Sequence, residues 1–245
     1  MTIQRQLAAE GLGTAILAAM AIGSAMMAER LGGSPLTALL ACSLVCGLGL
    51  FALLACFGNI SGAHFNPVLT LSEVVRGQIA APLAAGYIAV QCIGALSGVA
   101  AAHVMFNAPA FEAATIARST SGHWIGEFIA AFGLIGVCIG STRHGDRIMP
   151  FAVAAYVIAA FWFTPSSAFL NPAMTLAKAV TASPAGIRLS DVPSLVTAQL
   201  CGGLASTLLF SWLYPNQTSE HTSGPASVMC NAGLDTQTVR ASLHR

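Results

Sequence analysis

The sequence predicts an all-α membrane protein with six transmembrane helices and two re-entrant half-helices, related by an inverted repeat. Three observations lead to this prediction. The chain is 56% hydrophobic and 8% charged, whereas soluble domains are usually about 25% charged. Six long apolar segments occur along its 245 residues. A fifteen-residue stretch at 61–75 returns at 166–180 with seven identical positions. The chain therefore reads as two related halves.

The six apolar segments have the length of bilayer-spanning helices, for which about 20 residues are needed. They cover roughly 7–28, 36–57, 82–105, 124–142, 149–164 and 193–214. We therefore expect a short N-terminal segment (1–6) and a membrane domain (7–214) made of repeats at about 7–105 and 124–214. The Ser/Thr/Asn-rich tail, 215–245, shows no apolar periodicity and is predicted to be disordered.

The two copies of the repeated stretch carry the signals of a helix start. Asn66-Pro67 and Asn171-Pro172 combine a preferred N-cap with the residue favoured at the first helical position. The apolar run that follows is about ten residues long, or ~15 Å, which cannot cross a ~30 Å hydrocarbon core. Such segments are tolerated at membrane depth only when they are buried or line a watery cavity. Their meeting point is the expected transport pathway.

Each half has three spans, so the second half begins on the opposite side of the membrane from the first. Glu10 is echoed by Glu127, and Gln91 by Gln199. A carboxylate inside a membrane is expensive and marks a function. Two roles are open: a proton relay, or support of the adjacent re-entrant loop by accepting its backbone N–H groups. The inverted symmetry favours support.

Lysines and arginines in short loops set the orientation. With the N-terminus inside, six fall on the inner side and four on the outer side, which predicts that both termini are cytoplasmic. The inner ones are Arg5, Arg76, Arg143, Arg147, Arg240 and Arg245, and the outer ones are Arg30, Arg118, Lys178 and Arg188. Lys178 lies near the C-terminal end of the second half-helix, where a cation suits the helix dipole.

The motifs SGAHFNPV at 61–68, FLNPAMT at 169–175, AEGLGT at 9–14 and YIAVQCIGALSG at 87–98 resemble those of the major intrinsic proteins, the aquaporin and aquaglyceroporin family. The resemblance covers about residues 5–214. It implies half-helices that meet at mid-membrane, one pore per subunit, a homotetramer, and a multi-pass protein of the cell inner or plasma membrane. It also favours the supporting role of Glu10 and Glu127.

The physics of two facing half-helices predicts how the pore discriminates. Their N-termini each carry about half a positive charge, which repels cations. Asn66 and Asn171 cap these ends, so their N–H₂ groups can donate to a solute oxygen. His64 lies beside the first cap; it is a candidate pH sensor, although a fixed hydrogen bond at the inner mouth is favoured.

Two departures from the family pattern are informative. The first motif has Val68 where alanine is usual, while Ala173 keeps the alanine of the second. The arginine that usually follows the second motif is replaced by Met174. Spacing from the motifs places the other positions of the family's outer constriction at Cys46 in the second span, Ala168 in the loop, and Ala159 or Ala160 in the fifth span. This set predicts a wide, apolar selectivity filter without an aromatic ring.

Such a filter predicts a passive channel for small uncharged polar solutes of glycerol size or larger. Undissociated metalloid acids such as arsenite and methylated arsenicals are included, and water is expected to pass. The alternatives are a water-selective channel, an anion-permeable pore and, in another class, an ion-coupled secondary transporter. The sequence shows no nucleophile–base constellation, phosphate loop or metal-ligand spacing, so we expect no enzyme, cofactor, metal or nucleic-acid partner.

Overall fold

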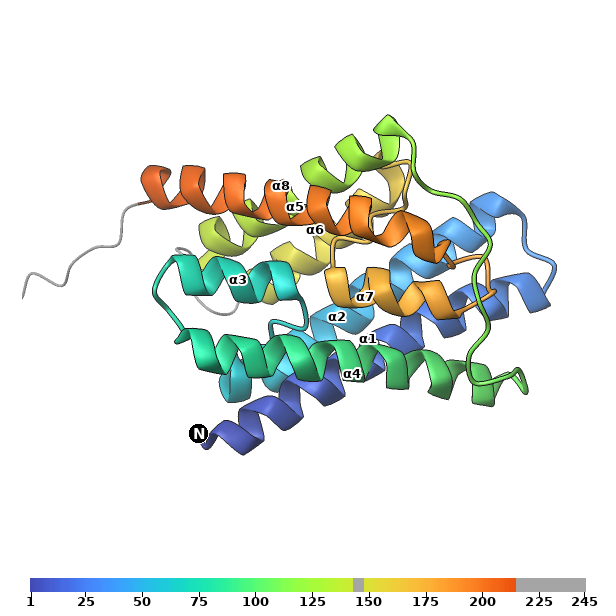
Figure 1. The fold of residues 1–245 in the computed structure, drawn as a ribbon, viewed down its shortest axis with the longest axis horizontal. Helices are drawn as coiled ribbons and strands as arrows, with labels where there is room; N and C mark the ends of the chain where they lie inside the picture. Colours follow the sequence, from blue (N-terminus) through green and yellow to red (C-terminus); the bar gives the residue numbers. More distant parts are fainter. Residues whose placement is uncertain (143–147, 215–245) are drawn as a thin grey trace, which may run out of the picture. The chain divides into compact units, whose positions relative to one another are not determined.

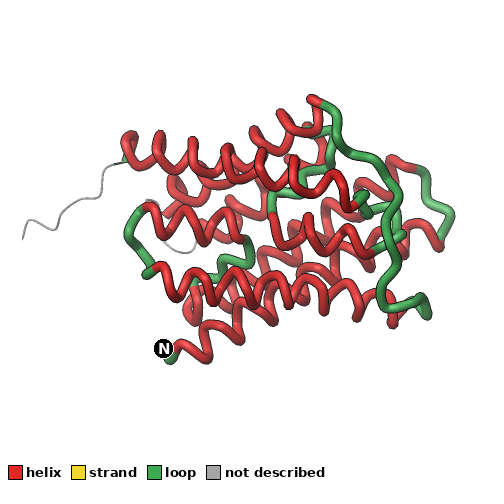
Figure 2. The backbone as a smooth tube through the Cα atoms, viewed as in Figure 1, coloured by secondary structure: helices red, strands yellow, loops and turns green. Residues whose placement is uncertain are grey.

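The computed structural model describes residues 1–142 and 148–214, and this part of the chain is helical, with no strand among the described residues (Figures 1 and 2). It holds six long helices and two short ones, and each short helix lies between the second and third long helices of its half. They are α1 (Ile3–Arg30), α2 (Pro35–Ser61), α3 (Pro67–Val75), α4 (Ala81–Met105), α5 (Ser121–Ser141), α6 (Met149–Phe163), α7 (Pro172–Ala177) and α8 (Val192–Leu213), with 3₁₀ turns η2 (Lys178–Val180) and η3 (Leu189–Asp191). The expected tail 215–245, and Arg143 and Arg147, lie outside the described residues.

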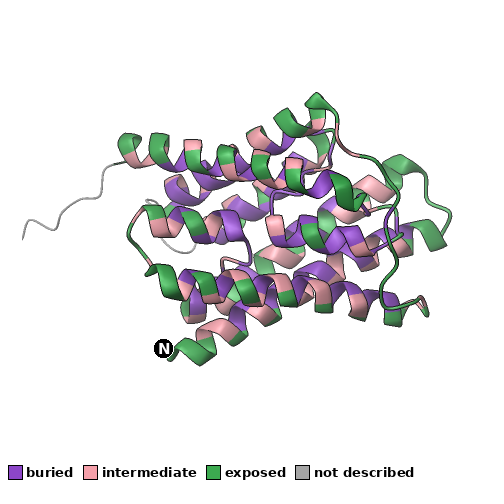
Figure 3. Cartoon of the chain, viewed as in Figure 1, coloured by how far each residue is buried: buried purple, intermediate pink, exposed green. Residues whose placement is uncertain are grey.

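Each of the six expected spans is one helix in the structure. The helices α1, α2, α4, α5 and α8 are long and apolar enough to cross a membrane, while α6 is an apolar helix of 15 residues. Large apolar side chains such as Leu40, Leu48, Ile93 and Leu208 are exposed on their outer faces, and the buried residues face inward (Figure 3). An apolar outer surface is what a bilayer requires. The chain is therefore a multi-pass membrane protein.

The half-helices α3 and α7 lie inside the bundle, between α4 and α8 (Figure 1). Each begins at a proline directly after its asparagine cap: Asn66 Oδ1 accepts from the Val68 N–H at 2.9 Å, and Asn171 Oδ1 from the Ala173 N–H at 3.0 Å. The α7 helix is shorter than expected, since it continues as the 3₁₀ turn η2. The two half-helices contact each other, and each contacts both α4 and α8.

Glycines allow the long helices to approach closely at equivalent points of the two halves. A Cβ at Gly94 would lie 2.3 Å from the Gly11 carbonyl oxygen, and one at Gly202 would lie 2.2 Å from the Phe128 carbonyl oxygen. The first pair joins α4 to α1 and the second joins α8 to α5. Small residues of this kind bring membrane helices into backbone contact, and here they fix the frame around α3 and α7.

The loop between α4 and α5 is laid against the far end of α7. The Glu112 and Ala114 N–H groups donate to the Val180 and Ala179 carbonyls at 3.0 and 3.1 Å. Asp191 accepts from the Arg118 N–H at 2.8 Å and pairs with Arg188 at 3.0 Å. The loop therefore fixes the turn η2 that follows α7.

Gly94→Ala is expected to destabilise the bundle by about 1–3 kcal/mol, because the new Cβ would overlap the Gly11 carbonyl of α1. Thermal unfolding in detergent would measure this change. Gly58→Ala in α2 is the matched control, since a Cβ there meets nothing within 4 Å, and it is expected to be neutral or slightly stabilising. Equal melting temperatures for Gly94→Ala and wild type would contradict the close contact of α1 and α4.

Candidate functional site

The two re-entrant loops hold non-glycine residues in a left-handed backbone conformation. Ala63 and Phe65 have φ of 51° and 50°, and their counterparts Ala168 and Leu170 have φ of 46° and 57°. Each such residue costs on the order of 1–2 kcal/mol, so the loops need support from their surroundings. The repetition of the same conformation at equivalent positions shows that the inverted repeat extends to the backbone.

A buried carboxylate supplies that support to the first loop. Glu10 Oε1 accepts from the Ser61 hydroxyl at 2.6 Å and from the His64 N–H at 2.9 Å. Glu10 Oε2 accepts from the Phe65 N–H at 2.7 Å and from Gln91 Nε2 at 2.9 Å. Both carboxylate oxygens are thus occupied by donors, in the arrangement by which a carboxylate holds a loop.

Glu127 makes the equivalent contacts in the second half. Its Oε1 accepts from the Ser166 hydroxyl and from the Phe169 N–H at 2.8 Å. Its Oε2 accepts from the Leu170 N–H at 2.9 Å and from Gln199 Nε2 at 2.6 Å. Neither carboxylate is exposed, and neither lines the cavity that runs through the bundle past both half-helices. These contacts argue against a proton relay through the pathway.

The two capping asparagines reach across to the opposite loop. Asn66 Nδ2 donates to the Leu170 carbonyl at 2.8 Å, and Asn171 Nδ2 donates to the Phe65 carbonyl at 2.7 Å. An amide nitrogen has two hydrogens, and in each case one remains. Both asparagines line the cavity, so the second N–H of each is placed to meet an oxygen there.

The residues next to the caps complete the junction of the half-helices. Val68 is buried and packs against α8 at Gly203, where an added Cβ would lie 2.2 Å from Val68 Cγ1. The glycine therefore makes room for the larger residue of the first motif. Ala173 is buried in one cluster with Cys46 and Met174. Val68 and Ala173 thus pack the tips of α3 and α7 into the helices around them.

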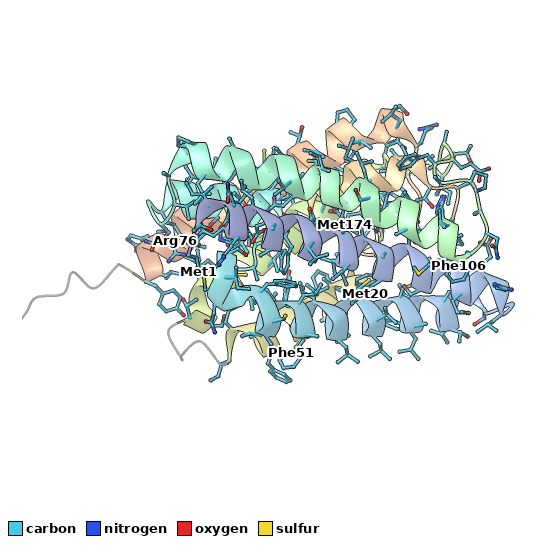
Figure 4. All side chains as sticks on the ribbon, turned by 90° about the horizontal axis from the view of Figure 1, so that it is seen from below. Met1, Met20, Phe51, Arg76, Phe106 and Met174 are labelled. Atoms are coloured by element: carbon cyan, nitrogen blue, oxygen red, sulfur yellow. The ribbon has the colours of Figure 1, made fainter. Side chains whose placement is uncertain are left out.

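A cavity of about 410 Å³ runs past both asparagines. Its walls between the mouths are mostly apolar, with Leu17, Leu134 and Val153 among them. At the end of α3 it is lined by Glu73 and Arg76, which form an ion pair at 2.7 Å. Arg76 lies toward the end of the bundle where the chain begins, and Met174 lies inside the bundle (Figure 4). The cavity is thus a pathway with a polar mouth, two central donors and apolar walls.

His64 lies on the cavity wall on the α3 side. Its Nδ1 is 3.1 Å from the Thr70 hydroxyl, and its ring meets the Tyr87 ring edge-on at 5.3 Å. These contacts fix the orientation of the imidazole. The hydrogen bond expected for His64 at this mouth is present in the structure, although its partner could not be named from the sequence.

Three of the expected filter residues, Cys46, Ala168 and Met174, line the cavity. The two candidates for the fifth-span position, Ala159 and Ala160, do not line the cavity. Ala159 is exposed on the outer face of α6, and Ala160 is buried among the core residues.

The α6 residues that line the cavity are Met149, Val153, Val157 and Phe161. Their spacing of four residues puts them on one helix face. Phe161 also packs against the cluster that contains Cys46 and Met174. An aromatic ring therefore lines the cavity beside Cys46 and Met174, a feature that the sequence analysis did not expect.

Lys178 is a second residue whose place the sequence analysis missed. It was assigned to the end of the second half-helix, but the structure shows it buried and lining the cavity. The signal was its position four residues after Met174, about one helical turn further along the segment that α7 and η2 form. The pathway therefore has a cation one turn beyond the methionine that replaces the usual arginine.

This architecture matches a known family. The family model for major intrinsic proteins matches residues 1–164. The chain belongs to the major intrinsic protein family. It is therefore a membrane channel of the aquaporin and aquaglyceroporin type.

Individual family members agree with this assignment. The chain is 37% identical over 211 residues to "Aquaglyceroporin AqpS" of Rhizobium meliloti (strain 1021), covering 86% of this chain and 91% of that protein. It is 28% identical to aquaporin-2 of Rattus norvegicus, covering 89% of this chain and 82% of that protein. The X-ray structure of the aquaglyceroporin from Plasmodium falciparum has a TM-score of 0.64 at 17% identity, over 87% of this chain and 96% of that one. This last likeness shows the fold.

Glu127→Gln is expected to destabilise the channel by at least about 2 kcal/mol. The new amide group would turn an N–H toward a backbone N–H that needs an acceptor, while the strained loop would lose a charge-assisted hydrogen bond. Thermal unfolding and solute flux in liposomes would measure the effect. Glu29→Gln is the control, because Glu29 is exposed. Wild-type stability in Glu127→Gln would contradict the supporting role of the carboxylate.

Proposed function

We propose that the protein is a passive channel for small uncharged polar solutes of glycerol size or larger, with water also passing. The observation that carries the proposal is Met174, which lines the cavity at the position where an arginine is usual in the family. A thioether side chain is flexible and does not fix a narrow, charged opening. Undissociated metalloid acids, such as arsenite and methylated arsenicals, belong to the same solute class.

Passage through this cavity needs no energy source. A solute hydroxyl can exchange its water partners for the N–H groups of Asn66 and Asn171 at the centre, while its carbon skeleton slides along the apolar wall. The positive N-terminal ends of α3 and α7 face the same point and repel cations. This combination suits polyols and uncharged oxyacids, which carry several oxygens on a compact skeleton.

A filter that includes Phe161 keeps the same class of solute and changes its size limit. Phe161 supplies an aromatic face near Met174, so the opening is less wide than a filter of Cys46, Ala168 and alanine would be. An aromatic face opposite a flexible side chain accommodates the apolar edge of a polyol. In this family, a strict water channel has a narrow filter that contains histidine and arginine. Neither residue type is present among Cys46, Phe161, Ala168 and Met174.

An ion-coupled transporter is disfavoured by the placement of the carboxylates. Ion coupling would need a free carboxylate in the pathway, and the carboxylates of Glu10 and Glu127 are occupied and lie outside the cavity. Glu73 lines the cavity, but it is paired with Arg76 at the mouth. In the described part of the chain, no other carboxylate lines this cavity.

The remaining expectations complete the proposal. We infer a homotetramer, with one pore per subunit, in the cell inner or plasma membrane and with both termini in the cytoplasm. The α3 mouth, with Glu73 and Arg76, is then the inner mouth, and the α7 mouth is the outer one. The name of the R. meliloti relative, an aquaglyceroporin, supports the solute class.

The first test follows the swelling of proteoliposomes by stopped-flow light scattering, with glycerol, arsenous acid and water as permeants. Glycerol and arsenous acid are expected to enter rapidly. A small methanethiosulfonate reagent is expected to slow entry in wild type, because Cys46 lines the cavity beside Met174. The slowing should be lost in Cys46→Ser and kept in Cys138→Ser. Cys138 also lines the cavity, but it packs with Leu134 and Val153, away from the cluster of Cys46 and Met174.

Two results would contradict the proposal. Rapid water flux with no entry of glycerol would show that the pathway is narrower than the filter side chains alone would make it. Loss of the slowing in Cys138→Ser with its retention in Cys46→Ser would place the narrow point away from Cys46 and Met174.

Phe161→Ala is expected to let larger polyols such as xylitol enter, several-fold faster than in wild type, because it removes a ring from the constriction. Ala159→Phe is the matched control: its side chain faces the exterior of the bundle, so the polyol size limit should not change. Entry rates for a series of polyols of increasing length would measure both. A size limit that moves in Ala159→Phe and not in Phe161→Ala would restore the sequence-based register of α6.

A further inference from the structure

Lys178 is a charged residue of the cavity wall to which the proposed channel function assigns no role. It is 7% exposed and lines the cavity. Its ammonium group lies 3.7 Å from the centroid of the Phe169 ring. Within residues 1–142 and 148–214 the Lys178 ammonium makes no hydrogen bond and no ion pair with a carboxylate. Buried lysines are rare unless they are paired, so this ammonium has donors to spare for something in the cavity.

The inverted repeat shows what Lys178 lacks. Its counterpart in the first half is Glu73, which is neutralised by Arg76 three residues later. The counterpart of Arg76 is Thr181, and the Thr181 hydroxyl lies 2.7 Å from His103 Nε2. The position that carries the counter-charge at the α3 mouth is therefore uncharged and otherwise engaged at the α7 mouth. The two mouths have the same frame, but the α3 mouth carries a neutral ion pair and the α7 mouth carries a cation without a paired carboxylate.

The neighbouring cation does not share this role. Arg118 also lies over the Phe169 ring, with Cζ 5.5 Å from its centroid, but its guanidinium donates to the Gly186 and Pro184 carbonyls at 3.3 Å. Arg118 does not line the cavity. It strengthens the positive field around Lys178 and leaves the lysine as the donor that faces the pathway.

The surroundings of Lys178 indicate the chemistry of its ligand. Cys46, Phe161 and Met174 line the same part of the cavity and offer a thiol, an aromatic ring and a thioether. Glu127 holds the loop that carries Phe169, and its oxygens are occupied by the N–H groups of that loop. A cation beside soft, apolar groups fits a small molecule with oxyanion oxygens at one end and a methyl-like group at the other.

We propose that Lys178 forms an oxyanion-binding subsite beside the filter, so that the pathway takes small oxyacids as monoanions as well as in uncharged form. The proposal rests on the channel function proposed above. The ammonium lies about one helical turn beyond Met174. From there it attracts an anionic solute without narrowing the opening at the methionine. The next positive field along the path is that of the half-helix ends at Asn66 and Asn171, so a monoanion meets attraction at both points.

Methanesulfonate and dimethyl sulfone are a matched pair of probes for this subsite. Both are tetrahedral and methylated, but methanesulfonate is fully ionised at neutral pH and dimethyl sulfone is uncharged. Liposomes would be placed in potassium methanesulfonate with valinomycin, so that potassium enters freely and swelling reports anion entry. Potassium gluconate, whose anion is larger, gives the baseline, and dimethyl sulfone swelling reports the open channel.

Wild type is expected to take up both probes. Lys178→Met, which keeps an unbranched side chain and removes the charge, should slow methanesulfonate entry at least tenfold, as expected for the loss of a close unit charge. It should change dimethyl sulfone entry by less than about twofold. Lys178→Arg keeps the charge and should retain methanesulfonate entry. Lys178→Gln is a second neutral variant, which separates loss of charge from the fit of methionine.

The outcomes distinguish this inference from the channel proposal. Wild-type liposomes that admit neither dimethyl sulfone nor glycerol would contradict the channel function itself. Entry of dimethyl sulfone without methanesulfonate, or unchanged methanesulfonate entry in Lys178→Met, would overturn the subsite while the channel stands. Loss of dimethyl sulfone entry in both neutral variants would show that Lys178 holds the fold through Phe169, and would also overturn the subsite.

Discussion

The fold depends on two carboxylates that are removed from water. An ionised carboxylate is costly to bury unless hydrogen bonds satisfy its oxygens, and Glu10 and Glu127 each receive donors on both. Two of the donors on each are backbone N–H groups of a re-entrant loop whose residues adopt left-handed conformations. The carboxylate thus offsets loop strain, and the loop offsets the desolvation of the carboxylate. Gln91 and Gln199 join this unit to α4 and α8, so the asparagine caps are placed by the long helices.

The supports are equivalent in the two halves, but the mouths they hold differ. The α3 mouth ends in the Glu73–Arg76 ion pair, whereas the α7 mouth has Lys178 against an aromatic ring. A symmetric frame with asymmetric ends is what an inverted repeat permits, since loop support and mouth chemistry use different residues. The positions that bond the backbone of the loops carry the same residue types in both halves, while Glu73 and Lys178 at the two mouths differ.

The sequence was sufficient for the features that depend on local chemistry and on the repeat. Residue types at fixed spacing predict the caps at Asn66 and Asn171, the short half-helices, and the equivalence of Glu10 and Glu127 in the two halves. The register of α6 is not predicted in this way, because a helix that is apolar on all sides shows no periodicity to separate the cavity face of Phe161 from the outer face of Ala159. Lys178 was placed on the correct helix end, but its burial depends on the loop that packs over η2, and that contact has no signal in the sequence.

Separating Met174 from Lys178 divides two tasks that a filter arginine performs together. An arginine at the narrow point both fills space and supplies charge, so a change in one alters the other. On the proposed assignments, a flexible thioether and the Phe161 ring set the width, and the Lys178 ammonium, at the start of the turn η2 that follows α7, sets the charge. Coulomb attraction falls with distance more slowly than steric contact does. The charge therefore acts on a solute still in the constriction, while the opening keeps the size that the apolar side chains give it.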